Sequence, residues 1–511
     1  MNCQRPGAEG PSKAQEIWPP RGRRSLPMTK IAPTTEQLAF CKEVWEGRPC
    51  FLSARAGTGK TSTIKMVFEE DETGADYTVG ADYTVVAFNN KNAAELQQAL
   101  PPKVKVATLH SLGFQAIKRF LPSVSIDQEK LYKLVKDAGI RGVNAQAKFR
   151  DTMRLVSCAK NWGIVPKEGR FKHSLLEDSP ETWLTLLEYF QLWDADPELA
   201  REILLQSNRQ VFSAQTIDFD DMVYLPVALG LQVFTTSKML VDEAQDLSPL
   251  NLAMLKKTPS KIWYVGDPFQ AIYAWRGAEA NVLEELRLPE FPLTRCWRCA
   301  KKIIQRAQVF VPDIRAWDEA PVGEVNEWTH LPDWTQHKPA TVLSRNNAGL
   351  IKIALQLQEN GQSCTILGKD FGQELRRVLA KLKGTTQKQL LESLLAWKHS
   401  MCEKYPHQRG KFLDISQCMQ SLIAHNHGKS QIEREILKLF SDFESPGAWV
   451  LSTIHKAKGL EWKTVWILDW SLSTGMLPWQ TREERNLKYV ATTRAKEILN
   501  IIKEEAWEIR E

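Results

Sequence analysis

An apolar strand, a glycine-rich loop and a helix follow one another near residue 55, and this order constrains the fold more than any other feature. The apolar pair Phe51-Leu52 precedes the loop, Ala54 replaces the first glycine of the usual P-loop pattern, and a helical stretch follows. Glycines let backbone N–H groups converge on phosphate oxygens, and a helix N-terminus favours negative charge. Lys60 can then reach the β- and γ-phosphates of a nucleotide, while the Thr61 hydroxyl can bind Mg²⁺. The residues expected to contact ATP here are Ala56, Gly57, Thr58, Gly59, Lys60, Thr61 and Ser62.

An acidic pair follows a second apolar run, Met239-Leu240-Val241, much further along the chain. Asp242 at the end of such a strand can hold Mg²⁺ through the water shell of the ion, and Glu243 can polarise an attacking water. Acidic pairs after apolar runs are common, so the pair gains its meaning from the preceding P-loop. Together the two segments predict a site for hydrolysing ATP.

A third segment, Val265 to Ala278, combines a strand end with polar and aromatic residues. Gln270 is placed where it could sense the γ-phosphate. Tyr273 and Trp275 flank one small residue and could present their rings to bases, because base stacking on aromatic rings tolerates any base sequence. The alternative, that both rings belong to a hydrophobic core, is the commoner role of an isolated Tyr-x-Trp.

Short apolar strands alternate with helical stretches along most of the chain. Several strands are apolar throughout, as in parallel sheets that are buried on both faces. The expected strands are Cys50 to Leu52, Thr84 to Phe88, Met239 to Val241, Ile262 to Val265, Thr341 to Leu343 and Thr464 to Leu468. Two long helical stretches interrupt them, and four apolar faces mark their helices. These faces are Leu131/Leu134/Val135/Ala138, Trp183/Leu186/Leu187/Phe190, Leu375/Val378/Leu379/Leu382 and Ile432/Ile436/Leu437/Phe440. The pattern predicts an α/β fold with two parallel sheets, each interrupted by a helical insertion.

Composition sets wider limits on a chain of 511 residues with a net charge of +6. The charge permits a polyanionic partner without requiring one. No apolar run reaches the length needed to span a bilayer, and the nine cysteines are scattered as in reduced intracellular proteins. We expect no membrane association, and a location in the cytoplasm and nucleoid or in the nucleus, depending on the host. Residues 1–30 have the composition of a disordered leader, and Met28 is a candidate natural start. The hexamer GADYTV occurs twice, at 74–79 and 80–85, and only the second copy needs to enter a strand.

Cys296-Trp297-Arg298-Cys299 is the one C-x-x-C spacing. A zinc site needs two more ligands, and no second C-x-x-C or paired histidine motif stands near it. Two reduced thiols are therefore the favoured interpretation.

The motifs together resemble, in order and spacing, the UvrD/Rep-type helicases of superfamily 1, including F-box DNA helicases, from about Pro33 to Lys496. An F-box is not recognisable in the leader. The resemblance implies two RecA-like P-loop NTPase domains. The expected ranges are 1–30 for the leader, 31–108 and 213–290 for the first domain, 109–212 for its insertion, 291–350 and 446–511 for the second domain, and 351–445 for a reduced second insertion.

Further nucleotide contacts are implied by the same resemblance. Gln37 would read the adenine edge, Trp297 would stack on the adenine in place of the usual tyrosine, and Glu461 would contact the ribose or couple to the γ-phosphate. Arg298 would reach the γ-phosphate, and Arg494 would act as an arginine finger, which stabilises charge on the transferring phosphoryl group.

Contacts with DNA follow in the same way. Small polar side chains and helix N-termini can dock phosphates. The implied DNA-binding residues are Asn89, Asn90, Thr108, His110, Tyr273, Trp275, Ser344, Arg345, Asn346, Thr453 and His455. The segment 216–224, with Asp218, Asp220 and Asp221, also matches the family, but we assign it no chemistry because acidic clusters repel DNA.

The resulting expectation is an ATP- and Mg²⁺-dependent helicase that moves on single-stranded DNA and unwinds tailed or forked duplexes in repair, recombination or replication. The segment Gln-x-x-Tyr-x-Trp-Arg-Gly from Gln270 favours 3′→5′ polarity by resemblance. Three alternatives stay open. They are a translocase that strips proteins from DNA with little unwinding, an RNA-directed motor, and an inactive DNA-binding scaffold of helicase fold. Protein partners are not indicated.

Overall fold

Short apolar runs form the strands of a first parallel sheet, of order β3-β2-β6-β7-β1-β8 in the computed structural model. The structure describes residues 32–68, 83–141, 145–190, 192–233, 236–257, 261–272, 283, 286–404, 409–468 and 478–503. The strands are β1 (Phe51–Ala54), β2 (Tyr83–Ala87), β3 (Lys105–Thr108), β6 (Lys238–Val241), β7 (Lys261–Gly266) and β8 (Glu290–Leu293). Tyr83 to Val85 of the second GADYTV copy enter β2 as expected, whereas the first copy and Met28 lie outside the described residues.

Both faces of this sheet are covered, which explains why the strands β1 and β2 are buried at every position. Alternate strand residues such as Leu52 and Val85 pack against α1 (Thr35–Trp45), α2 (Lys60–Phe68) and α3 (Asn90–Ala99). Their neighbours, such as Phe51 and Val86, pack against helices on the other face. These are α4 (Leu109–Phe120), α9 (Asp221–Ala228) and α10 (Pro249–Lys256).

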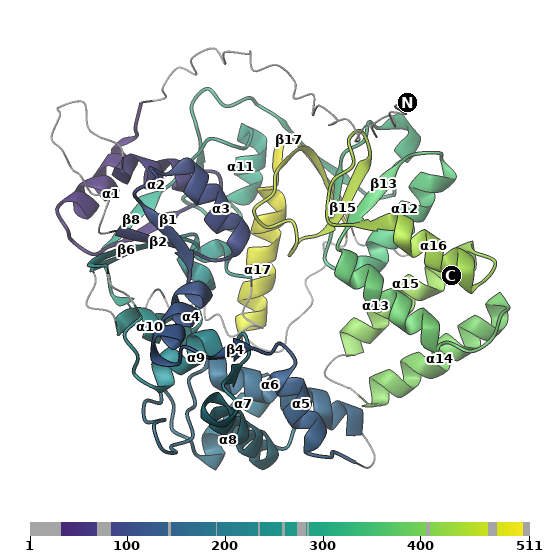
Figure 1. The fold of residues 1–511 in the computed structure, drawn as a ribbon. Coiled ribbons are helices and arrows are strands. Elements are labelled where there is room, and N and C mark those ends of the chain that lie inside the picture. Colours follow the sequence, from purple (N-terminus) through teal and green to yellow (C-terminus); the bar gives the residue numbers. More distant parts are fainter. Residues whose placement is uncertain are drawn as a thin grey trace, which may run out of the picture.

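The helical insertion of the first half extends the hydrophobic core that α4, α9 and α10 form on this second face of the sheet. Its remaining elements are β4 (Ser125–Ile126), α5 (Lys130–Asp137), α6 (Ala145–Asn161), α7 (Pro180–Tyr189), α8 (Pro197–Ser213) and β5 (Thr216–Ile217). The apolar face expected around Trp183 is buried in it, and so are Leu131, Leu134 and Val135 of the other face. The expectation is wrong for Ala138, which is exposed because α5 ends just before it. In Figure 1 this insertion lies below the first sheet.

A second parallel sheet has the order β11-β17-β16-β12-β15-β13-β14. The strands are β11 (Glu324–Trp328), β12 (Thr341–Ser344), β13 (Cys364–Leu367), β14 (Phe440–Ser441), β15 (Trp449–Thr453), β16 (Trp462–Ile467) and β17 (Ala495–Ile502). The prediction of two parallel sheets is confirmed. The strands β13 and β14 come from the 351–445 segment, which the sequence pattern presents as helical. The domain ranges therefore stay a proposal.

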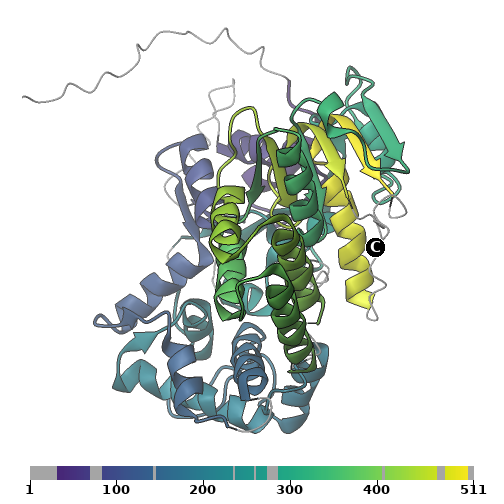
Figure 2. The same cartoon turned by 90° about the vertical axis from the view of Figure 1, so that its right-hand side faces the viewer.

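Five helices cover the second sheet and extend beyond it, and they face the reader in Figure 2. They are α12 (Asn347–Glu359), α13 (Lys369–Lys381), α14 (Gln387–Lys404), α15 (Arg409–His425) and α16 (Lys429–Leu439). The apolar face expected in α16 is partly wrong, because Leu437 is 57% exposed. Leu439 is buried instead, since it continues the Ile432–Ile436 stripe at helical spacing.

The two sheets meet at a shared apolar cluster. Ala56 and Ile272 of the first half pack with α11 (Lys301–Ala307) and α17 (Pro478–Thr492) of the second. The pair β9 (Arg295–Cys296) and β10 (Arg315–Ala316) lies beside them. Figure 1 shows α17, in yellow, between the two sheets. None of the described helices is long and apolar enough to cross a membrane.

Candidate nucleotide site between two sheets

The P-loop connects β1 to α2 and holds two glycines at positive φ, Gly57 at +69° and Gly59 at +91°. Glycine adopts such angles without the steric cost that other residues meet. A side chain at Gly57 would also collide with the second half, because its Cβ would lie 2.7 Å from Arg298 Cβ and 2.9 Å from Cys296 Sγ. The backbone N–H of Trp297 donates to the Gly57 carbonyl at 2.9 Å. The loop is therefore in direct contact with the segment that carries Arg298.

Other P-loop groups already have protein partners. The backbone N–H of Ala56 donates to the Tyr489 hydroxyl, so it does not point at a ligand in this structure. Thr58 is buried and its hydroxyl donates to the Arg55 carbonyl. Lys60, Thr61 and Ser62 form the first turn of α2, and the latter two are exposed.

The acidic pair lies at the carboxyl end of β6, next to the P-loop. Lys60 Nζ lies 2.7 Å from Glu243 Oε1. Burial opposes ionisation of both groups, but the attraction between them is stronger. This attraction raises the pKa of Lys60 and, together with the charge of Lys458, lowers the pKa of Glu243 to about 2. Burial and the neighbouring Glu243 charge raise the pKa of Asp242 to about 7. Glu243 is thus a charged acceptor at neutral pH.

The third motif adds two buried groups. Gln270, in a short turn after β7, donates through Nε2 to Asp267 Oδ2 at 2.7 Å. The backbone N–H of Asp267 donates to Gln245 Oε1, which ties this motif to the acidic segment. Tyr273 and Trp275 lie outside the described residues.

The second half supplies two arginines. Arg298 contacts Glu461, and its Nη1 donates to the Thr493 carbonyl at 3.4 Å. Arg494 is 1% exposed and donates to the Val490 and Leu460 carbonyls at 3.0 and 2.9 Å. Burial and the charge of Arg298 lower the pKa of Arg494 to about 10. No carboxylate forms an ion pair with Arg494 among the described residues, and its hydrogen-bond acceptors there are neutral oxygens.

One cavity of about 430 Å³ brings these groups together. The first half lines it with Gly57, Lys60, Thr61, Asp242, Glu243, Asp246 and Gln270, among others. The second half lines it with Arg298, Lys456, Lys458, Gly459, Leu460 and Arg494. Of the remaining nucleotide candidates, Trp297 packs beside Trp317, Glu461 pairs with Lys496 at 2.6 Å, and Gln37 donates to the Thr63 hydroxyl behind the loop.

The cavity fits a nucleotide triphosphate with a divalent cation. Asp242 Oδ1 is buried and has no hydrogen-bond partner within the described part of the chain. A buried carboxylate oxygen needs such a partner, and oxygen ligands are those that Mg²⁺ prefers. The cations of the cavity come from both halves, as a polyphosphate requires.

Sequence reasoning missed the contacts that join the two halves. Lys458 Nζ lies 2.6 Å from Asp246 Oδ2 and donates to the Gln270 carbonyl. Arg55 pairs with Asp313 at 2.6 Å. Lys458 lies in the same motif as the predicted DNA contacts Thr453 and His455. Its place in that motif is the only sequence feature that indicates its role.

Tyr489 on α17 provides the most buried of these contacts. Its hydroxyl accepts from the Ala56 N–H at 2.8 Å and donates to Asp267 Oδ2 at 3.3 Å. Replacing Tyr489 by phenylalanine leaves a buried P-loop N–H without an acceptor. We expect a loss of about 1–3 kcal/mol in unfolding free energy and weaker nucleotide binding, measured by urea unfolding and calorimetry.

Tyr224→Phe is the matched control, because the buried Tyr224 hydroxyl on α9 accepts from Asn208 on α8, and neither residue lines the nucleotide cavity. It should cost similar stability while nucleotide affinity stays unchanged. Equal nucleotide affinities for the Tyr489→Phe variant and the native chain would show that the Tyr489 contact does not shape the P-loop.

The candidate DNA-binding residues lie at the carboxyl ends of strands in both sheets. Asn89, Thr108 and Asn346 cap the N-termini of α3, α4 and α12 through their side-chain oxygens. Asn89 and Lys456 line the same cavity, so the two sets of strand ends face each other. Asn90 and His110 are exposed.

The remaining candidates in the second half are held by protein contacts. Ser344 is fully buried and accepts from the Asn346 N–H. Arg345 pairs with Glu484 at 2.7 Å, and His455 lies 4.0 Å from Glu483. Thr453 ends β15 and is half-buried. The positions of these residues do not test the DNA contacts, which remain predictions.

The acidic segment before α9 forms a buried ionic cluster. Lys130 lies 2.7 Å from Asp221 Oδ2, and Lys160 lies 2.7 Å from both Asp218 Oδ2 and Asp221 Oδ1. Asp221, Lys130 and Lys160 are no more than 1% exposed. The attraction of the two lysines outweighs burial and lowers the pKa of Asp221 to about 2. The cluster joins α5 and α6 to α9, so its role is structural.

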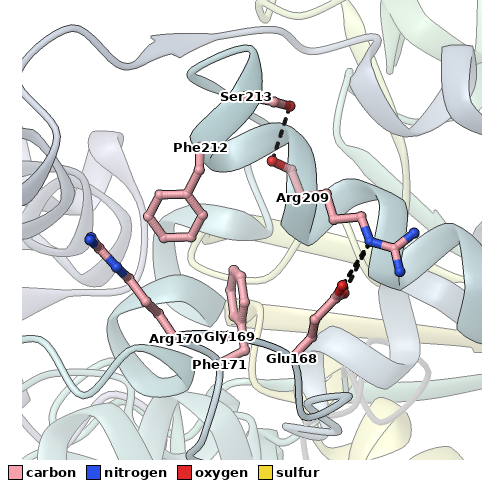
Figure 3. A pocket seen from close by; sticks show the side chains of 7 residues that line it. All are labelled: Glu168, Gly169, Arg170, Phe171, Arg209, Phe212 and Ser213. Atoms are coloured by element: carbon pink, nitrogen blue, oxygen red, sulfur yellow. Dashed lines mark hydrogen bonds and ion pairs between the residues drawn. The ribbon is translucent and has the colours of Figure 1, made fainter.

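A second cavity lies in the insertion, away from these motifs. Figure 3 shows Phe171 and Phe212 side by side, with Arg170 beside them and the Arg209–Glu168 ion pair at the rim. None of the nucleotide candidates lines it. Elsewhere, no cluster of three or more His, Cys, Asp or Glu side chains suited to a metal occurs among the described residues.

The two parallel sheets and the P-loop cavity between them define a two-domain P-loop NTPase fold. Residues 34–289 match the UvrD/REP helicase N-terminal domain, and residues 441–506 match the UvrD-like helicase C-terminal domain. The chain belongs to the UvrD/Rep helicase family.

Individual relatives are distant. The chain is 26% identical to the ATP-dependent DNA helicase Rep of Buchnera aphidicola subsp. Baizongia pistaciae, over 47% of this chain and 36% of that protein. It is 25% identical to Rep of Escherichia coli (strain K12), over 52% and 41% of the two chains. It is 23% identical to F-box DNA helicase 1 of Gallus gallus, over 95% and 50%. The chain thus spans half or less of the length of these relatives. The solved structure of PRRSV helicase aligns with a TM-score of 0.34 at 10% identity, over 93% of this chain and 55% of that one.

Proposed function

We propose that this chain is an ATP-dependent DNA helicase that moves 3′→5′ on single-stranded DNA and unwinds tailed or forked duplexes. The cavity lined from both sheets supports the proposal, because Lys60, Asp242 and Glu243 of the first half and Arg298 and Arg494 of the second all line it. The distant Rep relatives are named ATP-dependent DNA helicases, which supports the same substrate. Repair, recombination or replication is the cellular setting that we propose.

Each side of the cavity has a distinct chemical task. Lys60 and the backbone around Gly59 bind the β- and γ-phosphates, while Thr61 and Asp242 hold Mg²⁺. Bound Mg²⁺ supplies positive charge that offsets the charge developing on the phosphates. Glu243, ionised at neutral pH, orients a water molecule and accepts its proton.

The second half contributes positive charge to the nucleotide site and links that site to the second sheet. Arg298 and Arg494 bring cations to the γ-phosphate from the opposite sheet. Lys458 bridges the halves through Asp246 and the Gln270 carbonyl, so a change at Gln270 reaches the second sheet directly. Loss of the γ-phosphate removes the ligand that favours a closed cleft, and reopening moves the two sets of strand ends relative to each other. Alternating grip on DNA by these ends would produce steps along one strand.

Strand displacement on 3′-tailed, 5′-tailed and blunt DNA duplexes tests the proposal, with ATP hydrolysis followed in parallel. Lys60→Ala should lower hydrolysis by at least about 10²–10³-fold, because it removes a charged donor to the phosphates. Lys65→Ala, on the same helix but outside the cavity, should leave hydrolysis unchanged.

Four results would contradict parts of the proposal. Faster unwinding of the 5′-tailed duplex would reverse the polarity. Hydrolysis stimulated by single-stranded DNA without strand displacement would make the chain a translocase. Stronger stimulation by RNA would change the substrate. Full hydrolysis by Lys60→Ala would overturn the site itself.

A further inference from the structure

Two buried cysteines flank Trp297 and Arg298, the residues that we place on the nucleotide. Cys296 ends β9 and Cys299 precedes α11, and they are 0% and 1% exposed. The Cys299 thiol donates to the Thr493 carbonyl at 3.7 Å, one residue before Arg494. Cys296 Sγ packs on the P-loop, 2.9 Å from where a Cβ at Gly57 would stand. The pair therefore lies between the P-loop and the segment that positions Arg494.

We propose that Cys296 and Cys299 are a peroxide-sensitive dithiol whose closure to a disulfide disables the nucleotide site. A C-x-x-C pair has the spacing of dithiols that form a disulfide within one turn of chain. Oxidation of the pair does not depend on the proposed function, whereas its effect on ATP hydrolysis does.

Cys296 differs chemically from other cysteines of the chain. Its contact with the Cys299 side chain, together with nearby backbone N–H groups and Arg298, lowers the pKa of Cys296 to about 7. Burial raises the pKa of Cys50, Cys158 and Cys364 to about 12 instead. Thiolates are the reactive form of cysteine. Cys296 is thus the thiol expected to react first.

The oxidant has to be small, because Cys296 and Cys299 are 0% and 1% exposed and neither lines the cavity. Gly57, which lies beside Cys296 Sγ, does line it. Hydrogen peroxide is little larger than water and is the oxidant that we name, reaching Cys296 past Gly57 when the chain opens locally.

The reaction proceeds in two balanced steps. The Cys296 thiolate attacks one peroxide oxygen, the O–O bond breaks, and hydroxide leaves as Cys296 becomes a sulfenic acid. The Cys299 sulfur then attacks the Cys296 sulfur, an S–S bond forms, and the sulfenic oxygen leaves as water with the Cys299 proton. Overall, two thiols are oxidised to a disulfide and one peroxide is reduced to two waters.

Disulfide formation must move atoms that contact the site. Sulfur atoms in a disulfide lie about 2.05 Å apart. To reach that separation, either Cys299 gives up its hydrogen bond to the Thr493 carbonyl or Cys296 shifts against Gly57. The S–S bond also closes the chain from Cys296 to Cys299 into a small ring that contains Trp297 and Arg298. A displacement of about 1 Å at a positioning group can cost about 10²-fold in rate.

The experiment treats the reduced full chain with hydrogen peroxide, blocks free thiols, and maps peptides by mass spectrometry. We expect a disulfide between Cys296 and Cys299, and a fall of roughly 10- to 100-fold in ATP hydrolysis, reversed by dithiothreitol. Cys299→Ser should stop at the sulfenic acid, which dimedone labels at Cys296, and Cys296→Ser should give neither product. Cys364→Ser, a half-buried cysteine outside the cavity, should behave as the native chain does.

Two outcomes would overturn the proposal. One is peroxide-treated chain in which both thiols remain free while other cysteines are oxidised. The other is complete disulfide formation with unchanged hydrolysis and unchanged binding of a non-hydrolysable ATP analogue. A reduced chain that hydrolyses no ATP would contradict the proposed function instead, while the peptide map would still decide whether the disulfide forms.

Discussion

Replacing Arg494 by alanine should lower the rate of ATP hydrolysis by about 10³- to 10⁵-fold, the contribution of an arginine that stabilises the transferring phosphoryl group. Arg494 borders the cavity and is 1% exposed, and its hydrogen-bond partners in the described part of the chain are neutral oxygens. A buried cation without a counter-ion is costly unless an anion arrives. Steady-state hydrolysis with saturating single-stranded DNA measures the effect.

Arg485→Ala is the control for this variant. Arg485 lies earlier on α17, is exposed, and donates to the Phe310 carbonyl outside the cavity. Its removal should leave hydrolysis within a factor of about two, as for surface substitutions away from special features. A folded Arg494→Ala chain that hydrolyses ATP within tenfold of the native rate would exclude Arg494 from the reaction. Thermal unfolding, run beside the assay, shows whether that chain is folded.

The second large effect concerns stability. Asp221→Ala should destabilise the helical insertion by about 3–5 kcal/mol, because removing one partner leaves the other buried charges uncompensated. Lys130 and Lys160 both lie 2.7 Å from this carboxylate, and neither lysine can reach water. Hydrogen exchange of peptides from α5 to α8 reports the insertion separately from the sheets.

An exposed ion pair in the same insertion provides the comparison. Arg209 and Glu168 pair at 3.0 Å, but their side chains are 54% and 42% exposed. Glu168→Ala should therefore cost at most about 1 kcal/mol. If Asp221→Ala costs no more than Glu168→Ala, the buried cluster does not hold α5 and α6 to α9.

The sequence alone predicts which chemically active residues come after the ends of strands. Lys60 and Asp242 each follow a run of apolar residues, and parallel strands place such residues at one edge of a sheet. The six expected strands all occur, and none of their ends is shifted by more than two residues. The order of residues within each short segment is enough to predict these features.

Contacts between distant segments are not predictable in this way. Lys458 and Asp246 are separated by 212 positions, and nothing local to either residue indicates the pair. Tyr489 looks like an ordinary buried tyrosine of a helix until α17 is placed between the sheets. The side chains of Asn89 and Thr108 cap helices, a role that their resemblance to DNA contacts does not reveal.

Nucleotide discrimination tests the central claim, that both sheets hold one nucleotide, most directly. Calorimetry with Mg²⁺ compares binding of a non-hydrolysable ATP analogue and of ADP to the native chain, Arg298→Ala and Arg494→Ala. We expect the native chain to prefer the triphosphate, and both variants to lose this preference while still binding ADP. Variants that keep the full preference for the triphosphate would show that the second sheet does not contact the γ-phosphate.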